Sequence, residues 1–262
     1  MHIVVLAKPV PDTTGQERLG PDGRLDRAAV PAVVNANDEY ALEAALKLVE
    51  ADPAGGEVTL LSMAPANAPE TLRKALAMGA TRGVLVTDAT LEGSDALSTA
   101  RILAAALRTL TFDLVIAGAD TSDGGGGIVA AGVATLLGLP YLSYAARIEP
   151  VGGRVRVRRL SAVGYDVIEA PMPALVVATQ ALGEPRYPTL KGIMGARTKE
   201  IAALPLGDLD LGGVAVGGVV STTRLTASRA PAARGATQVV REPASVAAKL
   251  VVDFLAARRI LA

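Results

Sequence analysis

A glycine-rich segment is the part of this sequence best suited to chemistry. Residues 118–127 read Gly-Ala-Asp-Thr-Ser-Asp-Gly-Gly-Gly-Gly, between a strand-like run and a helix-like run. Four consecutive glycines let backbone N–H groups approach a ligand closely, and the helix N-terminus that follows favours an anion. Thr121 and Ser122 add hydroxyl donors. The segment is neither a Walker A nor a dinucleotide GxGxxG motif. It predicts a phosphate-binding loop, with a flexible turn as the alternative.

Two other segments are expected at the same edge of a sheet. Leu6, Ala7 and Lys8 end the first strand-like run, and residues 35–38 open a helix. Met63 follows the second strand-like run in the same way. Such a backbone frame with a phosphate loop suits an adenine nucleotide, because main-chain hydrogen bonds and small apolar walls can hold the base. Lys8 either meets the phosphate or is an ordinary solvated lysine.

The sequence offers no catalytic constellation. It has no cysteine and a single histidine, His2, which excludes disulfides, thiolate chemistry and a histidine cluster. Carboxylates are plentiful, but none forms the spaced pair typical of acid–base catalysis, and GxSxG and HExxH motifs are missing. We therefore predict neither catalytic nor metal-binding residues, which counts against a nucleotide hydrolase or ligase.

A second candidate surface lies near residue 190. The run Glu-Pro-Arg-Tyr-Pro-Thr-Leu at 184–190 follows an apolar strand-like run and precedes a basic stretch. Two prolines within four residues keep the backbone extended and break any helix. Such a segment does not fill a core, so we expect a rigid loop that presents Arg186, Tyr187 and Leu190 outward.

Alternating strand-like and helix-like runs must position these residues. Asn37 is expected to cap the first helix and Ser94 the third, and Gly79 to end the second. This βαβα order predicts a parallel sheet with helices on both faces and ligand sites at the carboxyl ends of its strands. The expected strands are 2–6, 58–62, 83–86 and 114–117, and the expected helices are 35–49, 69–78, 94–110 and 128–137.

The second part of the chain changes character. Residues 154–160 alternate and could pair with 165–169 as a hairpin, whereas 173–179 should rejoin the main sheet. Residues 203–241 are rich in Gly, Ala, Pro, Ser and Thr and predict an extended arm, followed by a final helix over 245–259. We predict a nucleotide-binding domain over 1–202 and an arm with a terminal helix over 203–262. This arm either wraps around a partner or packs on its own domain.

The composition limits the classes of function. Half of the 262 residues are apolar, so a sizeable core can be buried. The 26 acidic and 26 basic side chains give no net charge, which argues against nucleic acid as a partner. The longest apolar run, 128–142, is interrupted by glycines and a proline and is too short to span a membrane. Residues 1–7 are too few for a signal peptide. We predict a soluble, cytoplasmic protein.

Taken together, these segments resemble the beta subunit of electron transfer flavoproteins over nearly the whole chain. The Ala-Met-Gly-Ala run at 77–80 and the Glu-Pro-Arg-Tyr-Pro-Thr-Leu run at 184–190 are specific in combination. The other residues that carry the resemblance are 4–8, Val10, Asp12, Asn35, Glu39, 41–44, 70–76, 113–118, Ile193 and Met194.

The resemblance implies a three-layer α/β fold similar to the adenine nucleotide alpha-hydrolases, with the hairpin as an excursion and a C-terminal arm that contacts a larger alpha subunit. It implies an electron carrier rather than an enzyme. FAD, held mainly by the alpha subunit, would take electrons from acyl-CoA-type dehydrogenases, as in fatty acid beta-oxidation, and pass them to a membrane-bound quinone oxidoreductase. This subunit would bury one structural AMP.

The resemblance also assigns site residues. Its partner-docking residues are Glu184, Arg186, Tyr187, Leu190, Ile193 and Met194, with Leu190 as the hydrophobic anchor. Its cofactor-binding residues are Leu6, Ala7, Asn35, Ala36, Asn37, Asp38, Met63, Gly118, Thr121, Ser122, Asp123, Gly124, Gly125, Gly126, Gly127, Ile128 and Val129.

The chain departs from the family at the phosphate loop. Glycines occupy 124–127 where the family often has acidic and polar side chains, and Val129 replaces a threonine that would help hold phosphate. Phosphate would then rely on backbone N–H groups. Some relatives bind a second FAD in place of AMP and bifurcate electrons, which is one alternative. A nucleotide-sensing module of the universal-stress type is another, although a lone sensor needs neither the arm nor the 184–199 segment.

Overall fold

The computed structural model describes residues 1–15, 18–229, 235 and 237–261. It divides the chain into two compact units, Met1–Thr226 and Ala227–Ala262, which are described separately. The division therefore falls later than the predicted boundary after residue 202, and a strand of the main sheet crosses that predicted boundary.

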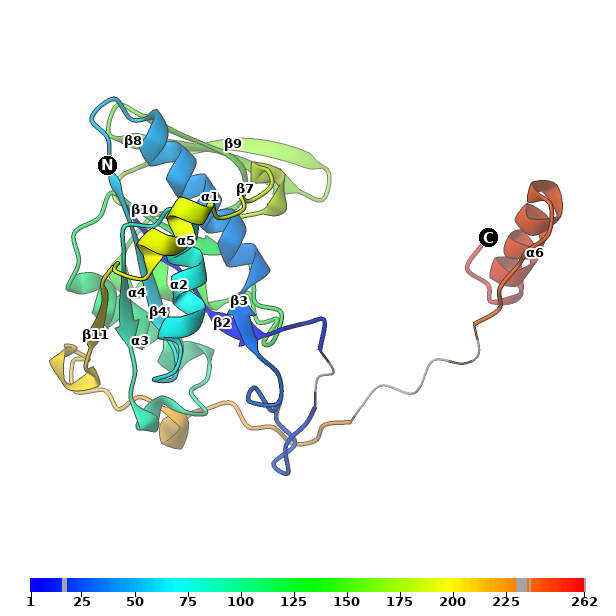
Figure 1. Ribbon diagram of the computed structural model, residues 1–262, viewed down its shortest axis with the longest axis horizontal. Coiled ribbons are helices and arrows are strands. Elements are labelled where there is room, and N and C mark those ends of the chain that lie inside the picture. Colours follow the sequence, from blue (N-terminus) through cyan, green and yellow to red (C-terminus); the bar gives the residue numbers. More distant parts are fainter. Residues whose placement is uncertain (16–17, 230–234, 236, 262) are drawn as a thin grey trace. The chain divides into compact units, whose positions relative to one another are not determined.

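The first unit is built on a nine-stranded sheet in the order β11-β5-β4-β1-β6-β10-β7-β8-β9 (Figure 1). Neighbouring strands are parallel from β11 to β7, and β7, β8 and β9 pair antiparallel. A separate antiparallel pair joins β2, Pro9–Pro11, to β3, Ala32–Val34. The main strands are β1 His2–Leu6, β4 Glu57–Met63, β5 Arg82–Val86, β6 Leu114–Gly118, β7 Tyr141–Val151, β8 Arg154–Ser161, β9 Gly164–Pro171, β10 Ala174–Ala178 and β11 Ile201–Leu204.

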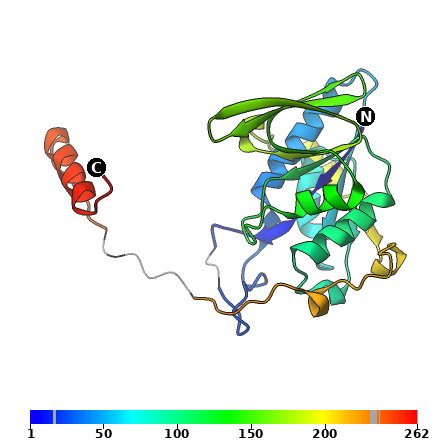
Figure 2. The same ribbon diagram turned by 180° about the vertical axis from the view of Figure 1, so that it is seen from behind.

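Helices cover both faces of this sheet. One layer holds α1 Ala36–Ala51, α2 Pro69–Met78 and α5 Leu190–Ala196, in front of the sheet in Figure 1. Figure 2 shows the other layer, α3 Ala96–Arg108 and α4 Val129–Leu137. The central strands are buried on both faces, as expected of parallel strands between helices. Each face has its own apolar core, dominated by Ala, Val, Leu and Ile.

The predicted α/β class, the mostly parallel sheet and the hairpin of β8 and β9 are confirmed. Helix α2 has its predicted bounds and ends at Gly79. Two predicted caps are wrong by a residue or two. Asn35 rather than Asn37 precedes α1, and Asp95 rather than Ser94 caps α3 because its carboxylate accepts the Ser98 N–H at 2.8 Å. Strands β2, β3, β7 and β11 were not predicted.

The chain after β11 first packs on its own domain. It runs through the short 3₁₀ turns η3, Leu206–Asp208, and η4, Gly218–Val220. Leu209 is buried in the core under α3, and Gly218 lies so close to the Glu92 carbonyl that a Cβ would collide with it. The part of the predicted arm that precedes residue 227 is therefore a strap on this domain.

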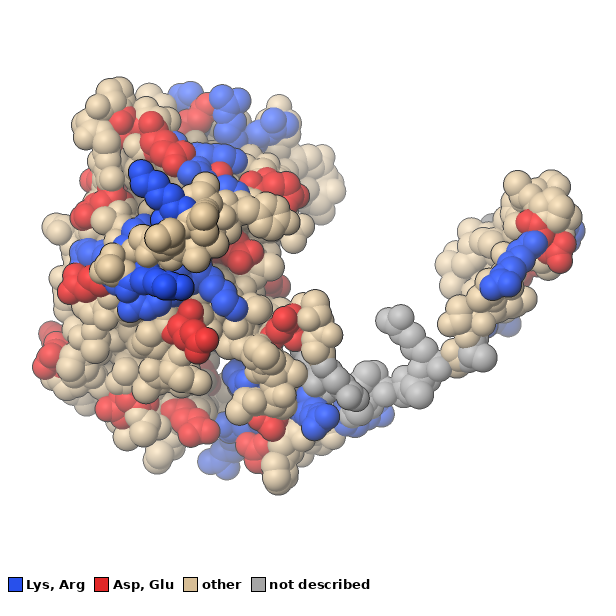
Figure 3. Space-filling model, in the orientation of Figure 1, with Lys and Arg blue, Asp and Glu red and all other residues tan. Residues whose placement is uncertain are grey.

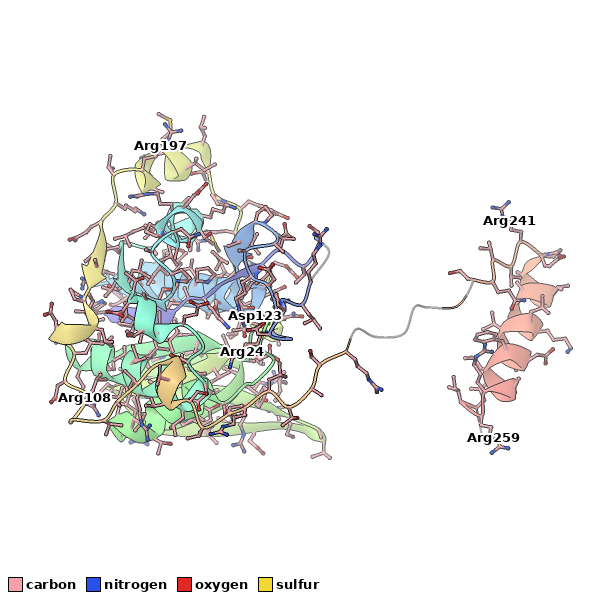
Figure 4. All side chains as sticks on the ribbon, turned by 90° about the horizontal axis from the view of Figure 1, so that it is seen from below. Arg24, Arg108, Asp123, Arg197, Arg241 and Arg259 are labelled. Atoms are coloured by element: carbon pink, nitrogen blue, oxygen red, sulfur yellow. The ribbon has the colours of Figure 1, made fainter. Side chains whose placement is uncertain are left out.

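Among the described residues of the second unit lies the helix α6, Ala244–Ala257, and Figure 4 labels Arg241 and Arg259 near its two ends. None of its residues is buried, although it carries several large apolar side chains. Those exposed by 40% or more are Val246, Leu250, Val251, Val252 and Phe254. Across the described ranges, we find no helix that combines the length and the apolarity needed to cross a membrane.

Candidate functional site

The predicted segments do meet at the carboxyl edge of the sheet. The end of β1, the start of α1 and the loop after β6 come together there, since β1 pairs with β6 and with β4. Gly118 ends β6 directly against α1, and a Cβ at this position would lie 2.5 Å from Asp38 Oδ1 and 2.7 Å from the Asn37 carbonyl carbon. A glycine is required here because the helix N-terminus approaches the strand so closely.

The N-terminus of α1 holds the glycine-rich loop through side-chain amides. Asn35 Nδ2 donates to the Asp120 carbonyl oxygen at 2.8 Å, and Asn35 Oδ1 accepts the Ser122 N–H at 3.2 Å. Asn37 Nδ2 donates to Asp120 Oδ1 at 2.6 Å. Asn35 is buried, and both its amide oxygen and its amide nitrogen take part in this link. The loop is thus fixed at its base. Asp120 is part of that attachment through its carbonyl oxygen and its carboxylate.

Asp38 is a buried carboxylate in the first turn of α1. Its Oδ2 accepts the backbone N–H of Lys8 at 2.8 Å, which ties the end of β1 to the helix. Burial raises the pKa of Asp38 to about 7, and the hydrogen bonds from Lys8, Asn35 and Gly118 only partly oppose this effect. The group therefore titrates near neutrality at the centre of the site.

A second carboxylate, Asp123, lies inside the loop itself and is labelled in Figure 4. Its side chain is only 1% exposed and accepts from Lys8 Nζ at 2.8 Å and from Arg27 Nε at 2.7 Å. Burial alone would raise the pKa of Asp123, but the hydrogen bonds from Lys8 and Arg27 outweigh it and hold the pKa below its usual range. Lys8 is therefore neither free nor simply solvated. Arg27, from the long loop between β2 and β3, had no sequence signal for this role.

The glycines at 124–127 form an exposed tip. Gly125 and Gly127 have φ of +55° and +61°, a backbone conformation that other residues rarely adopt. The Gly125 N–H donates to the Thr121 carbonyl at 2.7 Å, whereas the N–H groups of Gly126 and Gly127 have no partner among the described residues. Ile128, 61% exposed, precedes α4 without a side-chain cap, and α4 starts at Val129. The tip thus offers free backbone donors at a helix N-terminus.

The remaining predicted contacts line the edge. Leu6 and Ala7 are buried at the end of β1, Ala36 is exposed at the start of α1, and Met63 is half-buried at the end of β4. Next to Met63, the hydroxyl of Ser62 is buried and has no hydrogen-bond partner among the described residues. A buried hydroxyl without a partner is uncommon in folded proteins. Two surface hollows lie on the described part of the domain, one beside η4, lined in part by Asp22 and Arg24, and one beside α3.

The second candidate surface, near residue 190, is an exposed apolar patch. Tyr187, Leu190, Ile193 and Met194 are exposed by 94%, 75%, 48% and 63%. Leu190 is the first residue of α5, which Thr189 caps by accepting the Gly192 N–H at 3.0 Å. The predicted loop is thus an extended entry followed by a short helix. Figure 3 shows Lys and Arg side chains gathered around α5. In Figure 4, Arg197 beyond α5 lies at the top edge of the view, well separated from Asp123.

Arg186 does not point outward as expected. Its guanidinium turns back to Glu43 and Glu50 on α1 and is one-third exposed. Glu184 is exposed and accepts from the Tyr40 hydroxyl at 3.3 Å. The outward presentation of Tyr187 and Leu190 is confirmed.

A mostly parallel sheet covered by helices on both faces, with a glycine-rich loop and a helix N-terminus at its carboxyl edge, defines an α/β protein. Residues 22–209 match the family described as "Electron transfer flavoprotein domain", and this match covers more than half of the chain. The chain belongs to the electron transfer flavoprotein family, among its beta subunits.

The relatives support this placement over almost the full length. An "Electron transfer flavoprotein subunit beta" from Clostridium acetobutylicum is 37% identical over 256 residues, 97% of this chain and 98% of its own. A protein of the same name from Mycobacterium tuberculosis H37Rv is 37% identical over 265 residues, 99% of both chains. An "Acryloyl-CoA reductase electron transfer subunit gamma" from Anaerotignum propionicum is 39% identical over 208 residues, 78% of this chain and 77% of its own.

Proposed function

We propose that this chain is the beta subunit of a heterodimeric electron shuttle. With an alpha subunit it holds FAD, receives electrons from acyl-CoA-type dehydrogenases and delivers them to a membrane quinone oxidoreductase. FAD, held mainly by the alpha subunit, supplies the electron-carrying chemistry. The residues of this chain bind, orient and dock, and none is asked to break a bond.

We further propose that the carboxyl edge holds one AMP as a structural ligand, as in folds similar to the adenine nucleotide alpha-hydrolases. The observation that carries this proposal is the glycine tip, where the N–H groups of Gly126 and Gly127 lack partners among the described residues at the start of α4. The unpartnered hydroxyl of Ser62 also suits a bound group at this edge. Because Lys8 is paired with Asp123, the phosphate would rest on backbone donors.

The arm and α6 are proposed to contact the alpha subunit. Val246, Leu250 and Phe254 recur every four residues and share one face of α6, yet none of them is buried. A helix with an uncovered apolar face gains stability by packing against a partner.

The deciding experiment is co-expression with the candidate alpha subunit, followed by chromatography and mass spectrometry of the released nucleotides. One FAD and one AMP per heterodimer is the expected result. Two FAD and no AMP would replace the simple shuttle by an electron-bifurcating one. No complex and no nucleotide would overturn the proposal, and nucleotide binding by the isolated chain alone would favour a sensor of the universal-stress type.

A specific observation favours a second choice of electron partner. The relative from Anaerotignum propionicum is named as the electron transfer subunit of an acryloyl-CoA reductase. Under this alternative, the partner is an acyl-CoA reductase complex rather than a beta-oxidation dehydrogenase. Stable co-purification of the heterodimer with such a reductase would support it.

A further inference from the structure

Arg186 is bonded to two carboxylates of α1. Its Nε donates to Glu43 Oε2 at 2.7 Å and its Nη2 to Glu43 Oε1 at 3.2 Å. Nη1 and Nη2 also donate to the two oxygens of Glu50, at 2.5 and 2.9 Å. The backbone N–H of Arg186 adds a third bond to the Glu43 carboxylate, to Oε2 at 3.1 Å. Five donors in this geometry fix the orientation of the guanidinium and of the backbone that carries it.

The buried Glu43 carboxylate depends on Arg186 for most of its charge compensation. Its side chain is 4% exposed, and its only other cation within 4 Å among the described residues is Lys47, at 3.4 Å. Burial raises the pKa of Glu43, but the hydrogen bonds from Arg186 outweigh this effect and lower the pKa below its usual value. Hydrogen bonds from Arg186 likewise lower the pKa of Glu50. Both carboxylates are therefore ionised at neutral pH, and the pair persists over the physiological range.

Residues 184–199 form the docking segment, and its first part follows one face of α1. Tyr40, Glu43, Lys47 and Glu50 are spaced three or four residues apart and so lie on a single stripe of the helix. Tyr40 bonds to Glu184, and Glu43 and Glu50 bond to Arg186. The extended entry to the docking segment thus rests on α1.

The other end of the segment is fixed to α2. Arg73 Nη1 donates to the Ala196 carbonyl oxygen at 2.7 Å, and Lys199 Nζ donates to the Leu76 carbonyl oxygen at 3.0 Å. Gly192 touches the Ala77 carbonyl so closely that a Cβ would collide with it. The stretch between these two attachments contains Tyr187 and Leu190, both of which are exposed.

We propose that Arg186 is a positioning residue for electron transfer: it does not contact the partner dehydrogenase but fixes the angle at which Tyr187 and Leu190 meet that partner. This inference rests on the proposed docking function of the segment. Electron transfer through a small, transient interface depends on the orientation of its anchor residue. A displaced anchor lowers the fraction of encounters that lead to electron transfer.

The test removes, one at a time and together, the two sides of the contact between α1 and the docking segment. The variants are Arg186→Gln, Glu50→Gln and the double variant, in the FAD-loaded heterodimer. Arg156→Gln is the matched control, because it removes another exposed Arg–Glu pair, 2.5 Å long, on the hairpin. The reaction is reduction of the heterodimer by a purified acyl-CoA dehydrogenase with its acyl-CoA, with KM and kcat determined separately.

A positioning role predicts a KM for the heterodimer raised on the order of tenfold by Arg186→Gln. Glu50→Gln should give a defect of the same kind, and the double variant should be no worse than Arg186→Gln, because both act through one contact. FAD content should be unchanged. A normal KM in Glu50→Gln together with a defective Arg186→Gln would overturn the proposal in favour of direct contact. Lower melting temperatures with a normal KM in every variant would show that the contact of Arg186 with Glu43 and Glu50 only stabilises the fold, which would overturn the proposal.

A partner-independent measurement separates this inference from the proposed function. Hydrogen exchange of the 186–190 backbone in the heterodimer should speed up in Arg186→Gln and Glu50→Gln and stay unchanged in Arg156→Gln. If the dehydrogenase fails to reduce even the unmodified heterodimer, the proposed partner class is wrong, while the exchange result still decides whether Arg186 holds the segment. Unchanged exchange in Arg186→Gln would overturn the inference.

Discussion

Asp95 holds Thr222 to the start of α3. One oxygen of the Asp95 carboxylate, Oδ2, accepts the Thr222 N–H at 2.8 Å and the Thr222 hydroxyl at 3.0 Å. The other oxygen accepts the Ser98 N–H and caps the helix. The hydrogen bond from Ser98 and then those from Thr222 hold the pKa of Asp95 well below its usual range. A single charged group thus joins a helix cap to the strap that crosses the domain.

Replacing Asp95 should loosen both elements at once. Asp95→Ala is expected to lower the free energy of unfolding by about 1–2 kcal/mol through the lost cap, and to open the strap near residue 222 to proteases. Since the folded-state pKa is depressed, this contribution is fully present above the unfolded-state pKa and is lost as the pH falls from there through the folded-state pKa. Denaturant unfolding and limited proteolysis measure the two effects.

Ser94→Ala is the control for that prediction, because Ser94 donates its hydroxyl to the Leu91 carbonyl and does not cap α3. Equal losses in the two variants would contradict the assignment of the cap to Asp95.

The Asp38 carboxyl should make stability depend on pH near neutrality. Burial raises its pKa from 3.8 to about 7, so its stabilising contribution is complete below pH 4 and is lost as the pH rises through 7. The loss attributable to this group is at most about 4 kcal/mol. Asp38→Asn, which can still accept the Lys8 N–H, should flatten the stability profile between pH 4 and 7. A series of denaturant titrations would show this, and an unchanged slope would assign the dependence to other groups.

Leu190→Ala should slow reduction by a partner dehydrogenase without affecting the fold. Leu190 is 75% exposed, so its truncation removes little buried surface, whereas loss of a docking anchor costs about 2 kcal/mol or more of binding. Stopped-flow reduction and the FAD content of the heterodimer are the measurements. Val163→Ala, at a hairpin residue that is 99% exposed, is the control. A parallel loss of FAD would show instead that the segment supports the fold.

Two glycines of α5 should respond in opposite directions. Gly192→Ala brings a Cβ against the Ala77 carbonyl of α2, and such overpacking costs roughly 1–3 kcal/mol. Gly195 has nothing within 4 Å of an added Cβ, so Gly195→Ala should gain up to about 1 kcal/mol of helix propensity. Thermal unfolding of the two variants compares them directly. Equal changes in stability for the two variants would contradict the close contact between Gly192 and the Ala77 carbonyl.

Ending the chain after Thr226 should separate folding from assembly. Residues Met1–Thr226 form a compact unit with its own core, so the shortened chain is expected to fold. It should lose co-purification with the alpha subunit if α6 makes that contact. If the shortened chain still assembles at full yield, the alpha subunit must bind a surface other than α6.

The sequence predicted the parallel layers well because their signals are local. β1 is a continuous apolar run, and α2 has a proline at its start and a glycine at its end. β7 was missed because its buried residues recur every third position, as in Leu142, Ala145 and Ile148, around a bulge near Ala145. β2, β3 and β11 are too short to show a period of their own.

The site was harder to predict where distant residues meet. The glycine loop and the 35–38 segment could be selected from strand ends, but Arg27 approaches Asp123 from 96 positions away. The same limitation applies to Arg186, whose glutamate partners lie 143 and 136 positions earlier in the chain. Proline spacing predicts an extended backbone, but it does not indicate where a long basic side chain will turn.

The uncovered apolar face of α6 also bears on how a cell regulates this protein. If α6 makes the proposed contact with an alpha subunit, a copy made in excess of that subunit would keep the apolar face in water, where chaperones and proteases act on exposed apolar segments. The terminal helix would then report whether a subunit has been assembled, and cellular abundance would follow the supply of the alpha subunit rather than the rate of synthesis of this chain.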